Sequence, residues 1–231
     1  SIGGRYSYDR KAFSEDFSLA PPVTAYSLQG LDDSWSAFSG SLRLAYQPRA
    51  EFTAYTSISS GFKSGGYSIN QGPAFGPYDD ENVVTYECGF KSRLLNNTVQ
   101  INGAVFFSDY RDLQVALVDL VGIRVDNVAD AQVHGVELEL LARPIADVTL
   151  NGSVGYQVAR FDSYSTVDAA NPAAGVQDLS GNHLPQAPDI SVNVGGDWRL
   201  PIEVDGNFVL RLEYTWQDEL YFSPFNSDKM S

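Results

Sequence analysis

The sequence predicts an all-β fold: an antiparallel, up-and-down transmembrane β-barrel segment of about nine long strands. Two observations predict it. Apolar and polar residues alternate with a period of two over stretches of about 10 to 15 residues, whereas a globular strand usually has five or six. The connections also alternate strictly between long and short, as in bacterial outer-membrane barrels, which have long external loops and short periplasmic turns.

The individual strands are expected where residues of one parity are apolar. "TVQINGAVFFSDY" (98–110) is the clearest case: its odd positions are mostly apolar and its even positions mostly polar. Phe106 is a large apolar residue on the polar side, and the sequence leaves its surroundings open. Further strands with this alternation are expected at 41–47, 84–94, 133–141, 148–158, 190–200 and 208–217.

The apolar face of these strands is expected to contact lipid, and the polar face to line a wet lumen. A soluble sandwich would show the same alternation, with its apolar face in a core. Strand length and the order of the connections favour the barrel. The side chains expected to face lipid are Val99, Ile101, Val105, Phe107, Val136, Leu138, Leu140, Leu150, Val154, Tyr156, Leu210, Leu212 and Tyr214.

The connections divide into two classes by length and composition. Short turns rich in Pro, Asn, Asp and Gly are expected between consecutive strands, because these residues favour tight turns. Long connections rich in Gly, Pro, Ser, Asp and Tyr separate the resulting hairpins. The short turns are placed at 46–52, 93–99, 142–148 and 200–208, and the long connections at about 10–35, 64–82, 112–130 and 162–188.

Composition excludes several classes of protein. The 231 residues carry a net charge of −14 and a pI near 4.3, which argues against nucleic acid as a partner. No apolar stretch is long enough for a transmembrane helix, although barrel strands give a much weaker signal. The single cysteine, Cys88, permits no intrachain disulfide.

No motif predicts catalysis or a cofactor. "GFKSGGYS" (61–68) lacks the strand–GxxxxGK[ST]–helix context of a phosphate-binding loop. His134 and His183 have no metal-ligand spacing. The acidic stretches 31–33 and 78–82 lack the EF-hand pattern, so solvated loop charge is favoured over calcium binding. We therefore expect no enzyme activity, no cofactor and no metal site.

Several stretches, taken in order, resemble the β-barrel domain of TonB-dependent outer-membrane receptors. In "YECGFKS" a Tyr-Glu pair precedes Gly-Phe-Lys-Ser, and "DYRDLQV" follows after a tight turn and a strand. "HGVELELLARP" matches Gly-Val-Glu-Leu-Glu and Arg-Pro. Cys88 and His134 depart from the family, where Leu and Lys are more common. The matching stretches are 3–11, 50–68, 81–115, 127–144 and 184–195.

The resemblance implies a place in a larger protein. Residues 1–231 would be a partial barrel domain of the 22-stranded type, with a plug domain and TonB box before it and further strands after it. The implied location is the outer membrane of a Gram-negative bacterium. The implied partners are outer-membrane lipid, the TonB complex through the plug, and a scarce solute, by default an iron–siderophore complex. By loop position, the candidate solute contacts are Tyr67, Phe75, Tyr78, Tyr164 and Phe225, for which packing between loops is an equal alternative.

Two other classes remain open at this point. A soluble β-sandwich that binds carbohydrate or another ligand would need a core between two sheets. A passive porin-like barrel would need no plug. The membrane interpretation predicts that this chain alone does not form a soluble monomer, because two unpaired sheet edges and an apolar face would be exposed to water.

Overall fold

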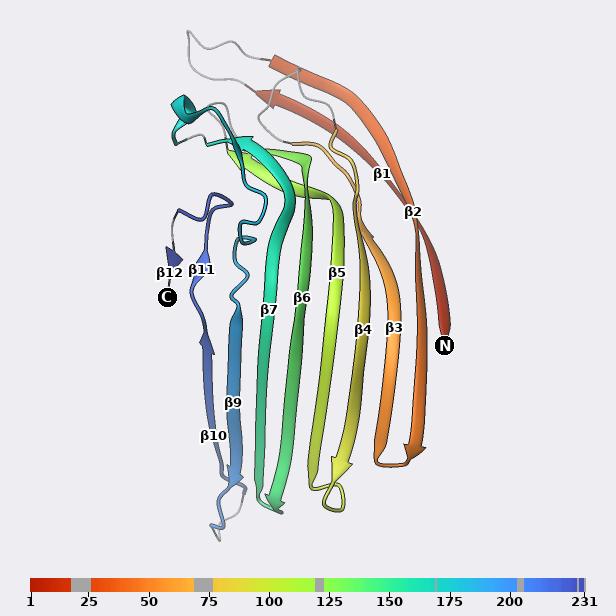
Figure 1. Ribbon diagram of the computed structural model, residues 1–231, viewed down its shortest axis with the longest axis vertical. Helices are drawn as coiled ribbons and strands as arrows, with labels where there is room; N and C mark the ends of the chain where they lie inside the picture. The colour runs from red at the N-terminus through yellow and green to blue at the C-terminus, as the bar shows by residue number, and fades with distance from the viewer. Residues whose placement is uncertain are drawn as a thin grey trace.

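A computed structural model of the chain shows a curved antiparallel sheet whose strands run side by side in sequence order (Figure 1). Within the residues that the structure describes, no helix is long and apolar enough to cross a membrane. The described residues are 1–17, 26–68, 77–118, 123–168, 170–202, 206–227 and 229–230.

The sheet contains nine long or medium strands and one short strand. Three further short elements are a 3₁₀ helix, η1 (Pro172–Ala174), and the small pair β11 (Leu220–Tyr221) and β12 (Lys229–Met230). The strands of the main sheet are β1 (Ile2–Phe17), β2 (Tyr26–Arg49), β3 (Phe52–Lys63), β4 (Glu81–Leu94), β5 (Val99–Val118), β6 (Ile123–Ile145), β7 (Val148–Val167), β8 (Val176–Asp178), β9 (Ile190–Arg199) and β10 (Val209–Gln217).

The topology is up-and-down. The path runs β1-β2-β3-β4-β5-β6-β7-β9-β10, every neighbouring pair is antiparallel, and β8 pairs with the end of β7. The strand ends that the short turns β2–β3, β4–β5, β6–β7 and β9–β10 join lie at one end of the sheet, and the other strand ends lie at the opposite end, here called the long-connection end (Figure 1). The predicted fold class and strand count are confirmed.

Several strands are longer than expected. β2 has 24 residues, β5 has 20, β6 has 23 and β7 has 20. The long connections placed at 10–35 and 112–130 are therefore wrong over much of their length, since β1 pairs with β2, and β5 with β6, through most of them. The reason is physical: pairing satisfies the backbone of a hairpin whatever its side chains contact, so these extensions need no period-two pattern.

The short turns lie where they were expected. β2 and β3 are joined at Arg49–Phe52, and β6 and β7 at Ile145–Val148. Between β4 and β5, Leu95, Asn96 and Asn97 all have positive φ, between 51° and 67°. Asparagine tolerates this left-handed region better than most residues, so the "LNN" sequence suits the turn. The turn at 200–208 lies partly outside the described residues.

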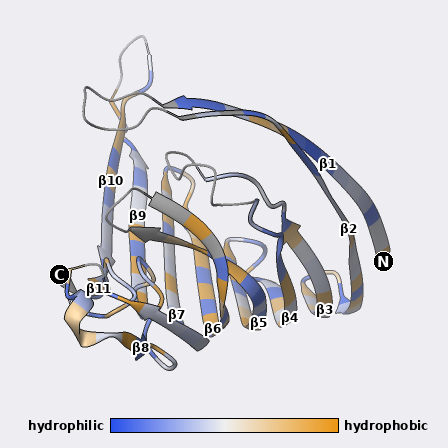
Figure 2. Ribbon diagram, turned by 90° about the horizontal axis from the view of Figure 1, so that it is seen from above, coloured by the Kyte–Doolittle hydropathy of each residue, from blue (hydrophilic) through white to orange (hydrophobic). Residues whose placement is uncertain are grey.

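The register places the two predicted faces on opposite sides of the sheet. One row across six strands runs Leu44, Thr56, Cys88, Val105, Val136 and Tyr156, and the adjacent row on the opposite face runs Arg43, Ser57, Glu87, Phe106, Gly135 and Gln157. Bands of apolar and polar residues alternate along the strands of the curved wall (Figure 2). We call the two sides the apolar face and the polar face.

A packed cluster of buried apolar residues lies at the long-connection end. Ala129, Phe161, Tyr164 and Leu179 are buried there, and partly buried residues including Phe225 surround them. The middle of the sheet instead exposes large apolar side chains. The second sheet that a soluble sandwich would need is therefore not found in the described part of the chain.

Candidate functional site

The apolar face carries the residues that were predicted to face lipid. All of them share this face in the register, from Phe107 on β5 to Tyr214 on β10. Val105 is 52% exposed and Leu212 is 68% exposed, far above what a protein core allows. Val99 and Ile101 are half-buried. Their contact with lipid stays a prediction.

The large, exposed apolar side chains of the apolar face form a band, here called the apolar band, which crosses the sheet diagonally. On β2 it is centred near Leu42, whose row leads through Ile58, Tyr86, Phe107 and His134 to β7. On β10 it runs from Leu210 to Trp216, so its centre lies at Glu213. The row of Leu42, extended beyond the pair Tyr156–Ile190, would reach position 220, which is seven residues from that centre. Seven residues are about 24 Å along a strand, and seven steps between strands are about 34 Å across the sheet.

This drift measures how the strands tilt relative to the band. A rise of about 24 Å over about 34 Å corresponds to a tilt of about 35°, and strands of transmembrane barrels tilt by about 35–45°. If the strands are inclined as in a membrane barrel, the apolar band therefore lies parallel to the membrane plane. On β3 and β4, apolar-face residues such as Ile58 and Tyr86 are exposed, whereas polar-face residues such as Tyr55 and Glu87 are half-buried. This asymmetry is expected if the wall curves toward the polar face.

A charged cluster occupies the polar face of β2, β3, β4 and β6. The guanidinium of Arg43 lies 4.1 Å from the ring centroid of Tyr55, a cation–π contact. The Tyr55 hydroxyl interacts with Glu87, and Glu137 lies close enough to act on it electrostatically. The ring of Tyr55 covers Gly89, where a Cβ atom would lie 2.6 Å from the hydroxyl oxygen. The cluster therefore combines two carboxylates with one arginine and needs a glycine beneath the tyrosine.

Phe106 lies on the polar face beside this cluster. Its ring covers Gly135 on the neighbouring strand, where a Cβ would lie 3.0 Å from Cζ of the ring. An aromatic ring over a cross-strand glycine shields the exposed backbone there. The structure thus gives Phe106 a contact within the wall itself, which the alternating pattern did not indicate.

The "GFKSGGYS" motif forms a packed junction at the long-connection end. The side chain of Tyr67 stacks on Phe13 with ring centroids 5.2 Å apart, and meets the buried Trp35 edge-on at 6.2 Å. Lys11 donates to the Ser64 hydroxyl at 2.8 Å. Gly65 lies against Trp35, with no room for a Cβ atom. The motif therefore fastens the end of β3 to β1 and β2.

Two amide side chains connect the neighbouring segments. The Nε2 atom of Gln114 donates to the carbonyl oxygens of Ser64 at 3.1 Å and Asp79 at 2.9 Å. The Nδ2 atom of Asn127 donates to the carbonyl oxygens of Asp79 at 3.1 Å and Asp112 at 2.7 Å. Sequence reasoning assigned neither residue a role, although both lie in the "DLQV" and "NVADA" stretches that carried the resemblance.

The predicted solute contacts separate into two groups. Tyr67 and Tyr78 lie at the β3 junction, where the Tyr78 ring meets Gly66. Tyr164 and Phe225 belong to the apolar cluster near β7, and Tyr164 is only 2% exposed. Phe75 lies outside the described residues. All four described rings pack within the protein, and their contact with a solute stays a prediction.

Charged groups at this end pair locally. Arg10 hydrogen-bonds Asp32, which holds the pKa of that carboxyl below its ordinary value. The hydroxyl and amide of Ser180 both donate to Asp178 and lower its pKa in the same way. Within the described part of the chain, no group of three or more His, Cys, Asp or Glu residues is arranged to hold a metal ion.

Comparisons with known proteins bear on the whole chain. A family model described as "TonB dependent receptor-like, beta-barrel" matches residues 1–230. The ferric yersiniabactin uptake receptor FyuA from Yersinia pestis aligns with a TM-score of 0.78 and 21% identity, over 99% of this chain and 33% of that chain. The siderophore receptor PiuA from Acinetobacter baumannii aligns at 0.71 and 16%, over 99% and 32%.

A copper transporter, OprC, is also similar, with a TM-score of 0.60 and 15% identity over 85% of this chain and 30% of that chain. At these identities the likeness is one of fold. The chain spans about a third of the length of the solved proteins that it resembles.

Proposed function

The chain belongs to the TonB-dependent receptor β-barrel family of the Gram-negative outer membrane, and we propose that it forms part of the wall of a receptor that imports a scarce solute with energy delivered through TonB. The single observation that carries this proposal is the family match over residues 1–230. The apolar band, level at a strand tilt of about 35°, supports it independently. The family comprises transporters rather than enzymes.

The chain supplies only part of such a receptor. Its length is about a third of that of the similar receptors, and a barrel of about 22 strands encloses a plugged lumen. We therefore assign residues 1–231 to the barrel domain and expect the plug and the remaining strands to come from other parts of the receptor. The polar face would then line the lumen, and the apolar face would contact lipid.

We propose that the charged cluster on the polar face contacts the plug. Glu87 and Glu137 provide two carboxylates, whereas Arg43 provides one guanidinium. The cluster therefore carries one uncompensated negative charge, which a cation of the plug would balance. Replacing Glu87 and Glu137 together with glutamine should loosen the plug and raise the influx of large antibiotics. The matched change Glu139→Gln, on the same strand and face, should leave the influx unchanged.

An iron–siderophore complex is the solute that the similar structures favour, since PiuA is a siderophore receptor and FyuA a ferric yersiniabactin uptake receptor. The distribution of charge supports a second candidate, a cationic metal complex. Of the residues that the structure describes, 18 of the 25 acidic ones but only seven of the 15 basic ones fall in segments at the long-connection end. A negative mouth attracts cations and repels anions. The described residues of these segments are 9–17, 26–36, 61–68, 77–84, 109–118, 123–132, 160–168, 170–190, 217–227 and 229–230.

Uptake measurements test both the transport mechanism and the solute. The full-length receptor is expressed in a strain without its own siderophore receptors, with and without TonB, and supplied with labelled ferric siderophores of different charge and with copper. The proposal expects saturable uptake of one of these solutes that disappears without TonB. Uptake that persists without TonB would instead identify a passive pore and refute the proposal.

A further inference from the structure

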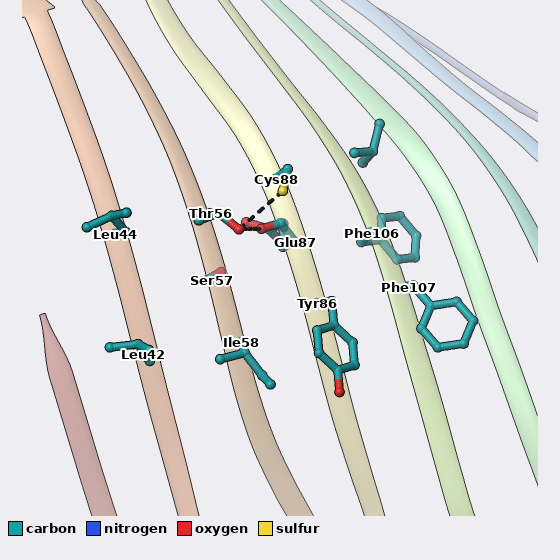
Figure 3. Close-up of a pocket in the computed structure, with 11 residues that line it drawn as sticks. Leu42, Leu44, Thr56, Ser57, Ile58, Tyr86, Glu87, Cys88, Phe106 and Phe107 are labelled. Carbon is teal, nitrogen blue, oxygen red and sulfur yellow. Dashed lines mark hydrogen bonds between the residues drawn. The ribbon is translucent and has the colours of Figure 1, made fainter.

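The apolar face has a shallow depression over β2, β3, β4 and β5 (Figure 3). Its floor is formed by Thr56 and Cys88, the two small side chains of their row. Larger side chains flank the floor: Leu44 in the same row, and Leu42, Ile58, Tyr86 and Phe107 in the neighbouring row. A second depression shares Cys88 and Val105 with the first and extends it toward β7.

The floor of this depression offers a ligand no polar group in need of a partner. The Cys88 thiol donates to the Thr56 hydroxyl at 3.2 Å, and that hydroxyl donates to the Glu87 carbonyl oxygen at 3.2 Å. What remains exposed is the Thr56 methyl group, the polarisable sulfur and the surrounding apolar side chains. The chemistry therefore fits an apolar occupant.

The depth of the depression limits what that occupant can be. From β2 to β10 the centre of the apolar band shifts by about one residue per strand. At that rate the centre lies at the level of Thr56 on β3 and Cys88 on β4. Tyr86 and Phe107 lie about 5–8 Å closer to the long-connection end. At that depth a membrane contains the far ends of acyl chains, and headgroups do not reach it.

We propose that the Thr56–Cys88 depression binds the terminal part of one acyl chain of an outer-leaflet lipid, held between Ile58, Tyr86 and Phe107. The inference uses only the outer-membrane location of the family and goes beyond solute transport. Lipid tails are as apolar as the wall, so hydrophobic transfer contributes little and close packing decides where a chain stays. A recess floored by small side chains gives that packing, because an unfilled recess would lose contacts on one side.

The test uses the full-length receptor in vesicles of dimyristoyl phosphatidylethanolamine. A trace of the same lipid carries a photoreactive diazirine at either the end or the middle of one chain, and adducts are mapped by mass spectrometry. With the end-labelled lipid, the peptides containing Thr56 and Cys88 should collect about threefold more adduct per exposed area than the rest of the apolar face. The mid-chain label should lack this enrichment. Adducts spread in proportion to exposed area would overturn the proposal.

A filled depression provides the matched control. Thr56→Leu should abolish the enrichment, whereas Ala142→Leu, on the same face but outside the depressions, should preserve it. Heat-modified migration of each variant on gels shows whether it has folded, and the wild-type measurement stands without either variant. Equal enrichment in wild type and in folded Thr56→Leu would also refute the site. Neither result depends on which solute the receptor carries.

Discussion

A depth series of arginine substitutions along β6 tests the membrane orientation of the sheet. His134, Leu138 and Ala142 all lie on the apolar face, four residues apart. The drift of the band puts its centre on β6 at Leu138. Four residues along a strand inclined by about 35° span about 11 Å of depth, so His134 and Ala142 lie near the two edges of a band about 25 Å tall.

The expected cost of arginine follows this depth. At the midplane an arginine on the lipid face costs about 2–4 kcal/mol, and near the interfaces about 0–1 kcal/mol. Leu138→Arg should therefore shift the unfolding equilibrium by about 30- to 900-fold, because each 1.36 kcal/mol is tenfold. His134→Arg and Ala142→Arg should shift it by about fivefold at most.

The measurement is equilibrium unfolding by guanidinium of the full-length receptor in vesicles, followed by tryptophan fluorescence. Ser153→Arg is the matched control, since Ser153 is exposed on the polar face of β7 and pairs with Glu139, which can accept the new charge. It should cost little at the same depth. A flat profile along β6, or a greater cost for Ser153→Arg than for Leu138→Arg, would refute the assignment of the apolar face to lipid.

Three further predictions concern the junction, pH and the isolated chain. Gly65→Ala forces a methyl group against the Tyr78 carbonyl oxygen and Trp35 and should destabilise the junction by about 1–3 kcal/mol, detected by hydrogen exchange of 64–68, whereas Gly152→Ala, where the nearest atom would lie 3.8 Å from the new Cβ, should not. Arg10 lowers the pKa of Asp32, so the ion pair should stabilise the β1–β2 hairpin fully above the ordinary carboxyl pKa of 3.8. This stabilisation should be lost as the pH falls through the lower pKa of the folded state. Asp32→Asn should remove that pH dependence, measured by hydrogen exchange of the hairpin. The 231-residue chain expressed alone should not be monomeric in detergent-free buffer, and a monodisperse monomer would contradict the membrane assignment.

The strands within the apolar band could be predicted from the sequence, and their extensions could not. From Val99 to Phe107, alternating surroundings impose a period of two, and the same holds for Leu210 to Trp216. Beyond the band, Leu113 and Val115 of β5 and Ala129 of β6 pack in or against the apolar cluster, while the backbone pairing continues to Val118 and Ile123. Composition alone made these paired segments resemble loops.

The site residues show a similar limit. Tyr67 and Tyr164 were predicted as solute contacts by loop position, with packing between loops as an equal alternative. One ring stacks on Phe13, and the other lies in the apolar cluster. Gln114 and Asn127 each hydrogen-bond carbonyl groups of neighbouring segments. Their role depends on carbonyl groups up to 51 residues away in the chain, which no local pattern encodes.

The sequence by itself determined the fold class, the order of the short turns and the two faces of each strand. The reason is that a strand whose two faces have different surroundings carries apolar and polar residues at alternate positions. Only the tertiary structure decided how those strands are offset from one another. The offset shows the diagonal band and its tilt, the Phe106 ring over Gly135, and the recess where Thr56 and Cys88 lie side by side. Each of these depends on which residues of different strands lie opposite one another, and pairing through the backbone fixes that register without a signature in any single strand.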